Sequence, residues 1–187
     1  MAKEKKPERD IKVVNIVVSS SLEHDIPLEK MAATLSNTEY NPEQFPGLVI
    51  RIKEPKTSAL IFSSGKIVCT GARTLDDVRL SIKKIIKSLE KINVKIKIDP
   101  VINVQNIVAS GSVGMDLNLN VLAMKLENTE YEPEQFPGLV YKLPELKATF
   151  LLFSNGKVVC TGTKSEAEVH AALDKLIENL KRVKSQK

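Results

Sequence analysis

The chain contains the same segment twice. An ungapped shift of 91 residues aligns residues 15–71 with residues 106–162, and 32 of the 57 aligned positions are identical. The best-matched stretch, NTEYNPEQFPGLV at 37–49, returns as NTEYEPEQFPGLV at 128–140. A duplication this close, without an insertion, predicts two similar units that pack with near two-fold symmetry. A partner that looks nearly the same from both ends, as double-stranded DNA does, would suit such a molecule.

Composition places the chain among soluble globular proteins. With 187 residues, of which 42% are hydrophobic and 27% charged, it can bury a sizeable core. No apolar run approaches the length of a membrane span, and no apolar region follows the charges of the opening AKEKKPERD. We therefore expect no signal peptide, no membrane partner and a cytoplasmic, nucleoid-associated location. The net charge of +5 suits a polyanionic partner but equally a lysine-rich solvated surface.

Each repeat is predicted to fold as a strand, a helix, several antiparallel strands and a long helix. In the first repeat, the strand-like runs are 13–19, 48–53, 58–63 and 66–70. Asp25 is expected to cap the first helix and Thr74 to begin the long one, while Ser165-x-x-Glu168 has the pattern of a capping box in the second repeat. The fold class is therefore α+β. We divide the chain into a mobile tail at 1–10, repeats at 11–97 and 98–183, and a tail at 184–187.

The strands are apolar on both faces, which is unexpected for a sheet with helices on one side only. Lys66 and Val68 share a face, and the turn-related register adds Leu60 and Phe62 to it. A broad apolar surface with lysines at its edge is typical of an interaction site. Another domain or subunit covering this face is the alternative.

Four of the five phenylalanines form repeat pairs: Phe45 with Phe136, and Phe62 with Phe153. Phe45 falls in a loop where full burial is not expected, whereas the unpaired Phe150 is predicted to point into the core. Exposed phenylalanines at each end of an apolar sheet are suited to insertion between DNA base steps.

These segments carry a resemblance to a known family. EYNPEQFPGLVIRIKEPKTSALIFSSGKIVCTGA and EYEPEQFPGLVYKLPELKATFLLFSNGKVVCTG resemble the first-repeat and second-repeat signatures of the TATA-box-binding protein family, particularly its archaeal form. The resemblance extends over about residues 11–182. It implies a general transcription initiation factor with the shape of a saddle: a curved antiparallel sheet that sits on the DNA minor groove, with helices on the convex face.

The resemblance also implies roles for individual residues. Asn15, Thr70, Asn106 and Thr161 would hydrogen-bond to the central base pairs, and Val17, Leu60, Val68, Val108, Leu151 and Val159 would cover the groove floor. Phe45, Phe62, Phe136 and Phe153 would intercalate and bend the DNA. Arg51, Ser64, Lys66, Lys142, Asn155 and Lys157 would meet the sugar-phosphate edges. Lys142 and Asn155 depart from the arginine and serine that are usual in the family.

The second-repeat loop is implied to recruit transcription factor B, and through it RNA polymerase. Its tip carries Glu130, Glu132 and Glu134, whereas the first repeat has Asn41 in place of Glu132. This difference would orient the complex on a nearly symmetric DNA site. For the free protein, a second copy of the chain is a further expected partner.

The sequence offers no support for catalysis, a metal or a cofactor. His24 and His170 lack histidine counterparts in the other repeat, and Cys69 and Cys160 are interpreted as small core residues that cannot build a four-ligand metal site. Two other non-catalytic functions stay open. One is a sheet-based single-stranded RNA binder, and the other is a homomeric scaffold that covers the apolar face with itself.

Overall fold

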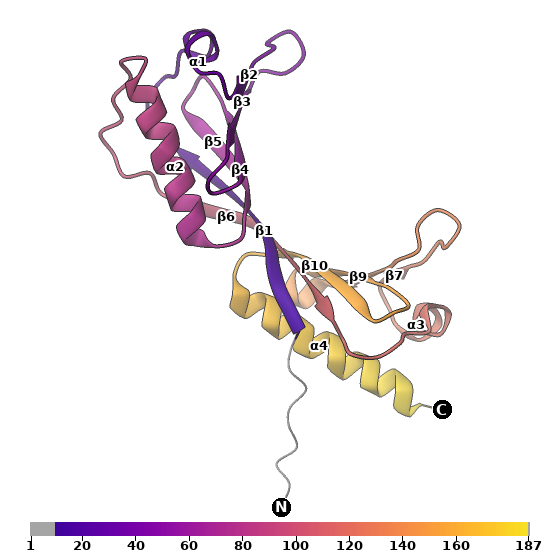
Figure 1. Cartoon of the computed structure of the whole chain (residues 1–187). Coiled ribbons are helices and arrows are strands. Elements are labelled where there is room, and N and C mark those ends of the chain that lie inside the picture. The colour runs from indigo at the N-terminus through magenta and orange to yellow at the C-terminus, as the bar shows by residue number, and fades with distance from the viewer. Residues whose placement is uncertain (1–9, 187) are drawn as a thin grey trace, which may run out of the picture. The chain divides into compact units, whose positions relative to one another are not determined.

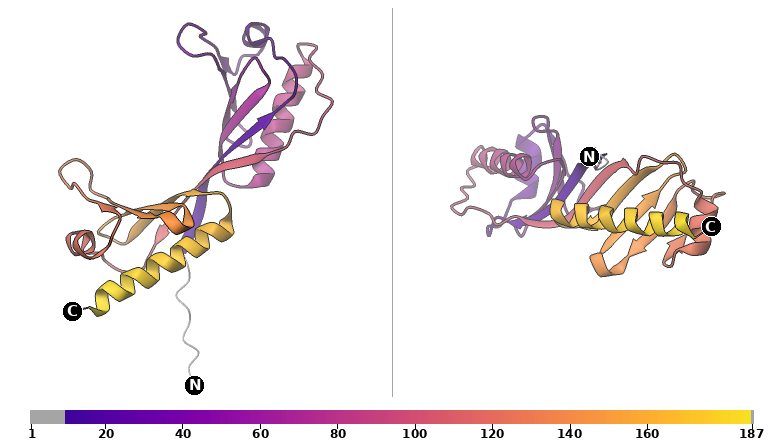
Figure 2. Two further views of the ribbon diagram at one scale, coloured as in Figure 1. Left: turned by 180° about the vertical axis from the view of Figure 1, so that it is seen from behind. Right: turned by 90° about the horizontal axis from the view of Figure 1, so that it is seen from below.

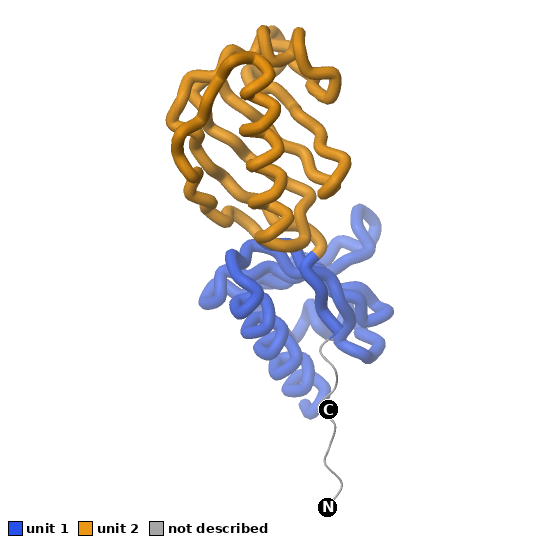
Figure 3. The backbone as a smooth tube through the Cα atoms, turned by 60° about the vertical axis from the view of Figure 1, so that its left-hand side comes forward, with its two compact units in different colours: residues 1–13, 107–187 blue, residues 14–106 orange. Residues whose placement is uncertain are grey.

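The computed structural model describes residues 10–186, which form two compact units (Figure 3). Unit 2 comprises residues 14–106, and unit 1 comprises residues 10–13 together with 107–186. The expected tail at 1–10 therefore lies outside the described residues, except for Asp10, which begins the first strand. The first and the sixth strand each have residues in both units, so the units do not follow the repeat boundaries drawn from the sequence.

Unit 2 is an antiparallel sheet with two helices (Figure 1). Its elements are β1 (Asp10–Ser21), α1 (Leu28–Thr34), β2 (Thr38–Glu39), β3 (Leu48–Ile52), β4 (Thr57–Ile61), β5 (Lys66–Ala72) and α2 (Leu75–Glu90). The strand order is β2-β3-β4-β5-β1.

Unit 1 repeats this architecture. Its elements are β6 (Asn103–Ser112), α3 (Leu119–Lys125), β7 (Thr129–Glu130), β8 (Leu139–Leu143), the 3₁₀ turn η1 (Pro144–Leu146), β9 (Ala148–Leu152), β10 (Lys157–Thr163) and α4 (Glu166–Ser185). The strand order is β6-β10-β9-β8-β7. Figure 2 shows α4 lying along one face of this sheet. The α+β class and the two similar units are as predicted, and α4 continues two residues beyond the boundary that we drew at residue 183.

The long helices begin where the sequence predicted. The Thr74 hydroxyl accepts a hydrogen bond from the Asp77 N–H at 3.1 Å, and the Ser165 hydroxyl accepts one from the Glu168 N–H at 3.1 Å. In a capping box, the Glu168 carboxylate would accept a hydrogen bond from the N–H of the N-cap residue Ser165. Here it accepts from the N–H of the preceding residue, Lys164.

The predicted start of the first helix is wrong. Asp25 does not cap α1, which begins at Leu28 after Pro27 and has no side-chain cap. The N–H of Ile26 instead donates to the Ser63 carbonyl at 2.8 Å, and the Ile26 side chain is buried. These contacts hold Ile26 outside the helix, which begins only after the proline. In unit 1, Asn118 caps α3 by accepting from the Val121 N–H.

The core of each unit lies between the sheet and its helices. In unit 2, β4 and β5 bury Ala59, Ile61, Ile67 and Cys69 on the helix side. In unit 1, the apolar residues of β8, β9 and β10 form one cluster with α3 and α4. Phe150 is fully buried in this cluster, as predicted.

Between residues 10 and 186, no helix combines the length and the apolar character needed to cross a bilayer.

Candidate nucleic-acid interface

The face of each sheet opposite its helices is apolar and partly exposed. In unit 2, Leu60 and Val68 lie directly opposite each other on β4 and β5, and both are half-buried although their strand neighbours are buried completely. Val17 on β1 has the same intermediate exposure. Their counterparts in unit 1 are Val108, Leu151 and Val159, also half-buried. The strand period thus places all six predicted floor residues on open faces.

Asn15 and Thr70 form a polar pair on the open face of unit 2. The Asn15 Oδ1 accepts a hydrogen bond from the Gly71 N–H at 2.7 Å, and its Nδ2 donates to the Thr70 Oγ1 at 3.1 Å. The backbone bond fixes which end of the amide is the donor. The Thr70 hydroxyl can itself donate to the Asn15 Oδ1 at 3.2 Å. The second hydrogen on Nδ2 is therefore the donor that this pair can offer a ligand. Their repeat counterparts are Asn106, the last residue of unit 2, and Thr161 in unit 1.

Each unit carries a phenylalanine pair at the far end of its open face. Phe45 and Phe62 meet edge to face with ring centroids 6.0 Å apart and planes at 66°, and Phe136 and Phe153 do so at 6.0 Å and 71°. The loop rings of Phe45 and Phe136 are each 43% exposed. Two rings in this arrangement present an apolar edge of fixed orientation.

A buried glycine lies beneath each loop ring. A Cβ atom on Gly47 would approach the Phe45 ring to 2.7 Å, and one on Gly138 would approach the Phe136 ring to 2.6 Å. The ring can therefore take this position only above a glycine. Neither glycine was among the site residues predicted from the sequence, although both lie in the best-matched stretch of the duplication.

The predicted edge cations divide into two kinds. Lys66 and Lys157 are exposed at the starts of β5 and β10. Arg51 instead forms an ion pair with Glu39 at 2.6 Å, and Lys142 pairs with Glu130 at 3.1 Å. All four paired side chains are more than half exposed, so neither ion pair contributes much to folding.

The two polar turn residues also differ. Ser64 is exposed in the β4–β5 turn. Asn155, its counterpart, accepts a hydrogen bond from the Lys157 N–H at 3.1 Å, which leaves its amide nitrogen as the donor.

The three predicted partner-binding glutamates are not in one environment. Glu130 lies on β7 opposite Val140, so it shares the open face with its ion-pair partner Lys142. Glu132 and Glu134 are exposed in the following loop. The backbone carbonyl of Glu132 holds this loop by accepting from the N–H groups of Gln135 and Phe136, each at 3.0 Å.

Two further cations were missed from sequence. Lys56 and Arg73 line a groove of about 520 Å³ together with Thr70 and Ser58 at the end of β5. Their counterparts are Lys147 and Lys164, so the same charge returns at the same repeat position. That recurrence was the signal that could have identified them.

Residues 10–186 contain no group of three or more histidine, cysteine, aspartate or glutamate side chains that could hold a metal ion. Cys69 and Cys160 are buried free thiols, and burial raises the pKa of each to about 11. Thiols in this state are poor nucleophiles, as expected of core residues. His170 is half-buried on α4, with its Nδ1 shielded from solvent.

Comparison with known proteins gives a consistent result. The family described as "Transcription factor TFIID (or TATA-binding protein, TBP)" matches residues 10–92 and again residues 101–183. The chain is 49% identical over 176 residues to the TATA-box-binding protein of Methanocaldococcus jannaschii, covering 94% of this chain and 96% of that protein. It is 52% identical over 175 residues to that of Picrophilus torridus, covering 92% and 95%. The solved structure of Methanococcus jannaschii TBP matches with a TM-score of 0.87 and 48% identity, over 92% of this chain and 99% of that one.

Proposed function

The chain belongs to the TATA-binding protein family, and from this premise we propose that it is a general transcription factor that binds TATA-box DNA through the open faces of both units. The observation that carries the proposal is the pair of apolar open faces, each ending in an edge-to-face phenylalanine pair. It would act at the nucleoid in the cytoplasm.

The chemistry of the open faces favours the minor groove of A·T-rich DNA. A·T pairs present only acceptors there, whereas guanine adds an amino group that an apolar surface would leave unpaired. The few donors at the centre, Asn15 and Thr70 with Asn106 and Thr161, suit base acceptors. Leu60, Val68 and their equivalents would lie against the groove floor.

The phenylalanine pairs would bend the DNA by inserting between base steps, a mode of binding for which this family is the standard example. Unstacking a step costs a few kcal/mol, which favours sites with easily unstacked pyrimidine–purine steps. The glycine beneath each loop ring fixes the wedge before DNA arrives, so less conformational entropy is lost on binding.

Cations along the edges would bind the phosphates. Lys66 and Lys157 are accessible for this, and we add Lys56 and Arg73 with their repeat counterparts Lys147 and Lys164. Arg51 and Lys142 would have to exchange a carboxylate for a phosphate, with Ser64 and Asn155 as neighbouring donors. Phosphate contacts of this kind make the affinity strongly dependent on salt.

Recruitment of transcription factor B, and of RNA polymerase after it, would use the loop of unit 1. Glu132 and Glu134 present exposed carboxylates, while Glu130 is paired with Lys142 and would lose this ion pair when a DNA phosphate binds that lysine. Replacing Glu132 and Glu134 by lysine should leave binding to TATA DNA intact and abolish the supershift by purified factor. An unchanged supershift would overturn this assignment.

A gel-shift comparison tests the DNA proposal against the alternatives. TATA duplex should bind more tightly than a G·C duplex or either single strand. If single strands bind as tightly as the TATA duplex or more tightly, the protein would instead be a sheet-based binder of single-stranded RNA. A concentration-dependent dimer with no DNA binding would indicate a homomeric scaffold.

A further inference from the structure

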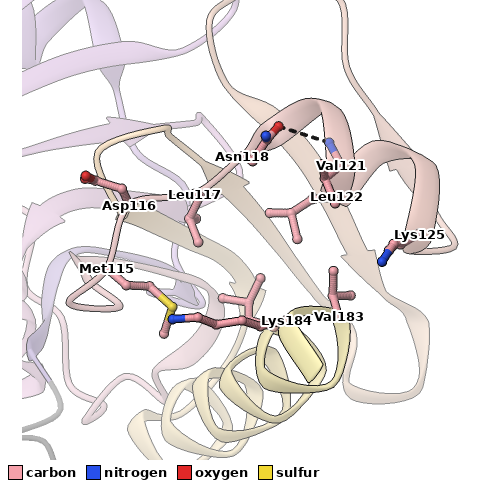
Figure 4. A pocket seen from close by; sticks show the side chains of 10 residues that line it. Met115, Asp116, Leu117, Asn118, Val121, Leu122, Lys125, Val183 and Lys184 are labelled. Carbon is pink, nitrogen blue, oxygen red and sulfur yellow. Dashed lines mark hydrogen bonds between the residues drawn. The ribbon is translucent and has the colours of Figure 1, made fainter. Parts of the chain in front are cut away.

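A pocket of about 370 Å³ lies within unit 1, between α3 and the C-terminal end of α4. Its apolar lining consists of Met115, Leu117, Val121, Leu122, Leu180 and Val183. Figure 4 shows Met115 and Leu117 from the loop before α3, Leu122 from α3 and Val183 from α4 around this pocket. The volume lies within the range of ligand pockets in proteins.

In unit 2, the chain turns back at the end of the long helix. Helix α2 ends in a Schellman motif: Asn93 is left-handed with φ 60°, its N–H donates to the Glu90 carbonyl, and the Val94 N–H donates to the Leu89 carbonyl. This motif typically folds the residue after the turn onto the side chain at the start of the motif, here Val94 onto Leu89. Both are buried, with exposed fractions of 7% and 0%.

Unit 1 lacks this turn. Leu180 is the repeat counterpart of Leu89, and Ser185 is the counterpart of Val94. Because α4 continues to Ser185 without a left-handed residue, the chain does not fold back over Leu180. Ser185, the residue that corresponds to Val94, therefore lies on the helix in unit 1 and not in a turn that folds back after it.

The rim has changed in the same direction. Met115 and Val121 line the pocket where unit 2 has His24 and Lys30. Two polar side chains of unit 2 thus correspond to apolar side chains at the pocket of unit 1. Apolar surface gained at an open pocket is typical of a site that meets a partner.

The charge around the pocket indicates what the partner carries. Lys125 and Lys184 line it against a single carboxylate, Asp116, and Lys181 precedes Lys184 by three residues on α4. The segment KRVKSQK at 181–187 contains four basic and no acidic side chains. Anionic groups would therefore be attracted to this end of the helix, which the α4 dipole alone would repel.

We propose that this pocket docks an acidic amphipathic segment of a partner protein, which inserts an aliphatic side chain beside Leu180 and places its carboxylates at Lys125 and Lys184. The inference rests on unit 1 alone and is independent of DNA binding. A small amphipathic molecule or a second copy of the chain would use different contacts, and the experiment below separates them.

The methionines provide the measurement. Met115 lines the pocket, Met124 is exposed on α3, and Met31 is buried in unit 2 at the position equivalent to Leu122. With methyl-¹³C methionine, a short synthetic peptide with leucines on one face and glutamates on the other should shift the Met115 signal saturably. Met31 should stay unmoved. A peptide with lysines in place of the glutamates should bind with an affinity that is lower by about tenfold or more.

Two variants complete the test. Val121→Lys introduces the residue that unit 2 carries at this position, and Lys184→Glu reverses an exposed charge, so both should fold. Each should weaken the glutamate peptide about tenfold while thermal unfolding and TATA binding stay unchanged. The proposal is overturned if the Met115 signal does not respond to the glutamate peptide, or if the Met31 signal responds equally. It is also overturned if the lysine peptide binds as tightly as the glutamate peptide, or if both variants bind the glutamate peptide as tightly as the native protein does. Shifts of Met115 that follow protein concentration without peptide would overturn it in favour of self-association.

Discussion

Single residues hold the proposed wedges in place. Gly47 and Gly138 are buried under Phe45 and Phe136, and both lack the Cβ that would displace the ring. Neither glycine has a left-handed φ. A glycine is therefore required because there is no room for a Cβ atom under the ring, and not because of the backbone conformation. The same arrangement occurs in both units.

Gly47→Ala is expected to displace the Phe45 ring, because the new methyl would lie 2.7 Å from it. The affinity for TATA DNA should fall by about tenfold as the wedge is no longer preformed. Titration with labelled duplex measures this, and thermal unfolding serves as the control for an intact fold. An alanine variant with unaltered affinity would show that the ring position does not matter.

The buried thiols predict a pH dependence. The pKa of Cys69 and of Cys160 rises from 9.0 to about 11 on burial, so folding favours the neutral thiol. This contribution is complete below pH 9 and is lost as the pH rises towards 11, by on the order of 1–3 kcal/mol per thiol. Denaturant unfolding at pH 8 and pH 10.5 should show a steeper loss of stability in the native protein than in a Cys69→Ala, Cys160→Ala variant. Equal slopes would exclude the thiols as its source.

At the scale of elements, the repeats have different polar pairs between sheet and long helix. In unit 1, the Asn179 amide on α4 donates to the Tyr141 hydroxyl on β8 at 2.7 Å, and both residues are buried. In unit 2, a polar pair at different repeat positions joins the long helix to the sheet: Ser81 on α2 and Thr57 on β4, 2.8 Å apart. Each hydroxyl of this second pair has another backbone acceptor, the Asp77 or the Pro55 carbonyl.

Tyr141→Phe should therefore lower the free energy of unfolding by about 1–3 kcal/mol, because it leaves the Asn179 amide without its partner in the core. Ser81→Ala is the matched control and should cost less, since Thr57 keeps the Pro55 carbonyl. Urea unfolding of both variants measures the difference. A larger loss in Ser81→Ala would contradict the reasoning.

The sequence predicted these elements where a period existed. Alternation along 58–63 and 66–70 identified the buried and the open face correctly, and the caps at Thr74 and Ser165 marked both long helices. The strands Thr38–Glu39 and Thr129–Glu130 were not predicted, because two residues carry no period. The start of α1 was misplaced because a tertiary hydrogen bond from Ile26 decided it.

The candidate site was predictable to the same extent. The open-face residues follow from strand alternation together with the family resemblance, and the structure brings them together within each unit. The ion pairs of Arg51 with Glu39 and of Lys142 with Glu130 could not be predicted from the sequence. The two residues of each pair are 12 positions apart, and they meet only because a strand of two residues, β2 or β7, pairs with the next strand. The clustering of Lys56 and Arg73 with Thr70 likewise depends on the β4–β5 register.

At the scale of the whole molecule, the duplication gives two open faces and two phenylalanine pairs, which under the proposed function would act on one DNA duplex. Within residues 10–186, each unit contains one such phenylalanine pair. Two wedges acting on one duplex should bend it more than either does alone, which makes the bend the property that depends on both repeats.

Energy transfer between dyes at the two ends of a TATA duplex tests this claim most directly. We expect the native protein to bring the two ends of the duplex together and so to increase the energy transfer. Phe62→Ala and Phe153→Ala should each reduce this increase. The double variant should nearly abolish the increase, even at protein concentrations that saturate the DNA. A full increase in transfer with both phenylalanines replaced would contradict it.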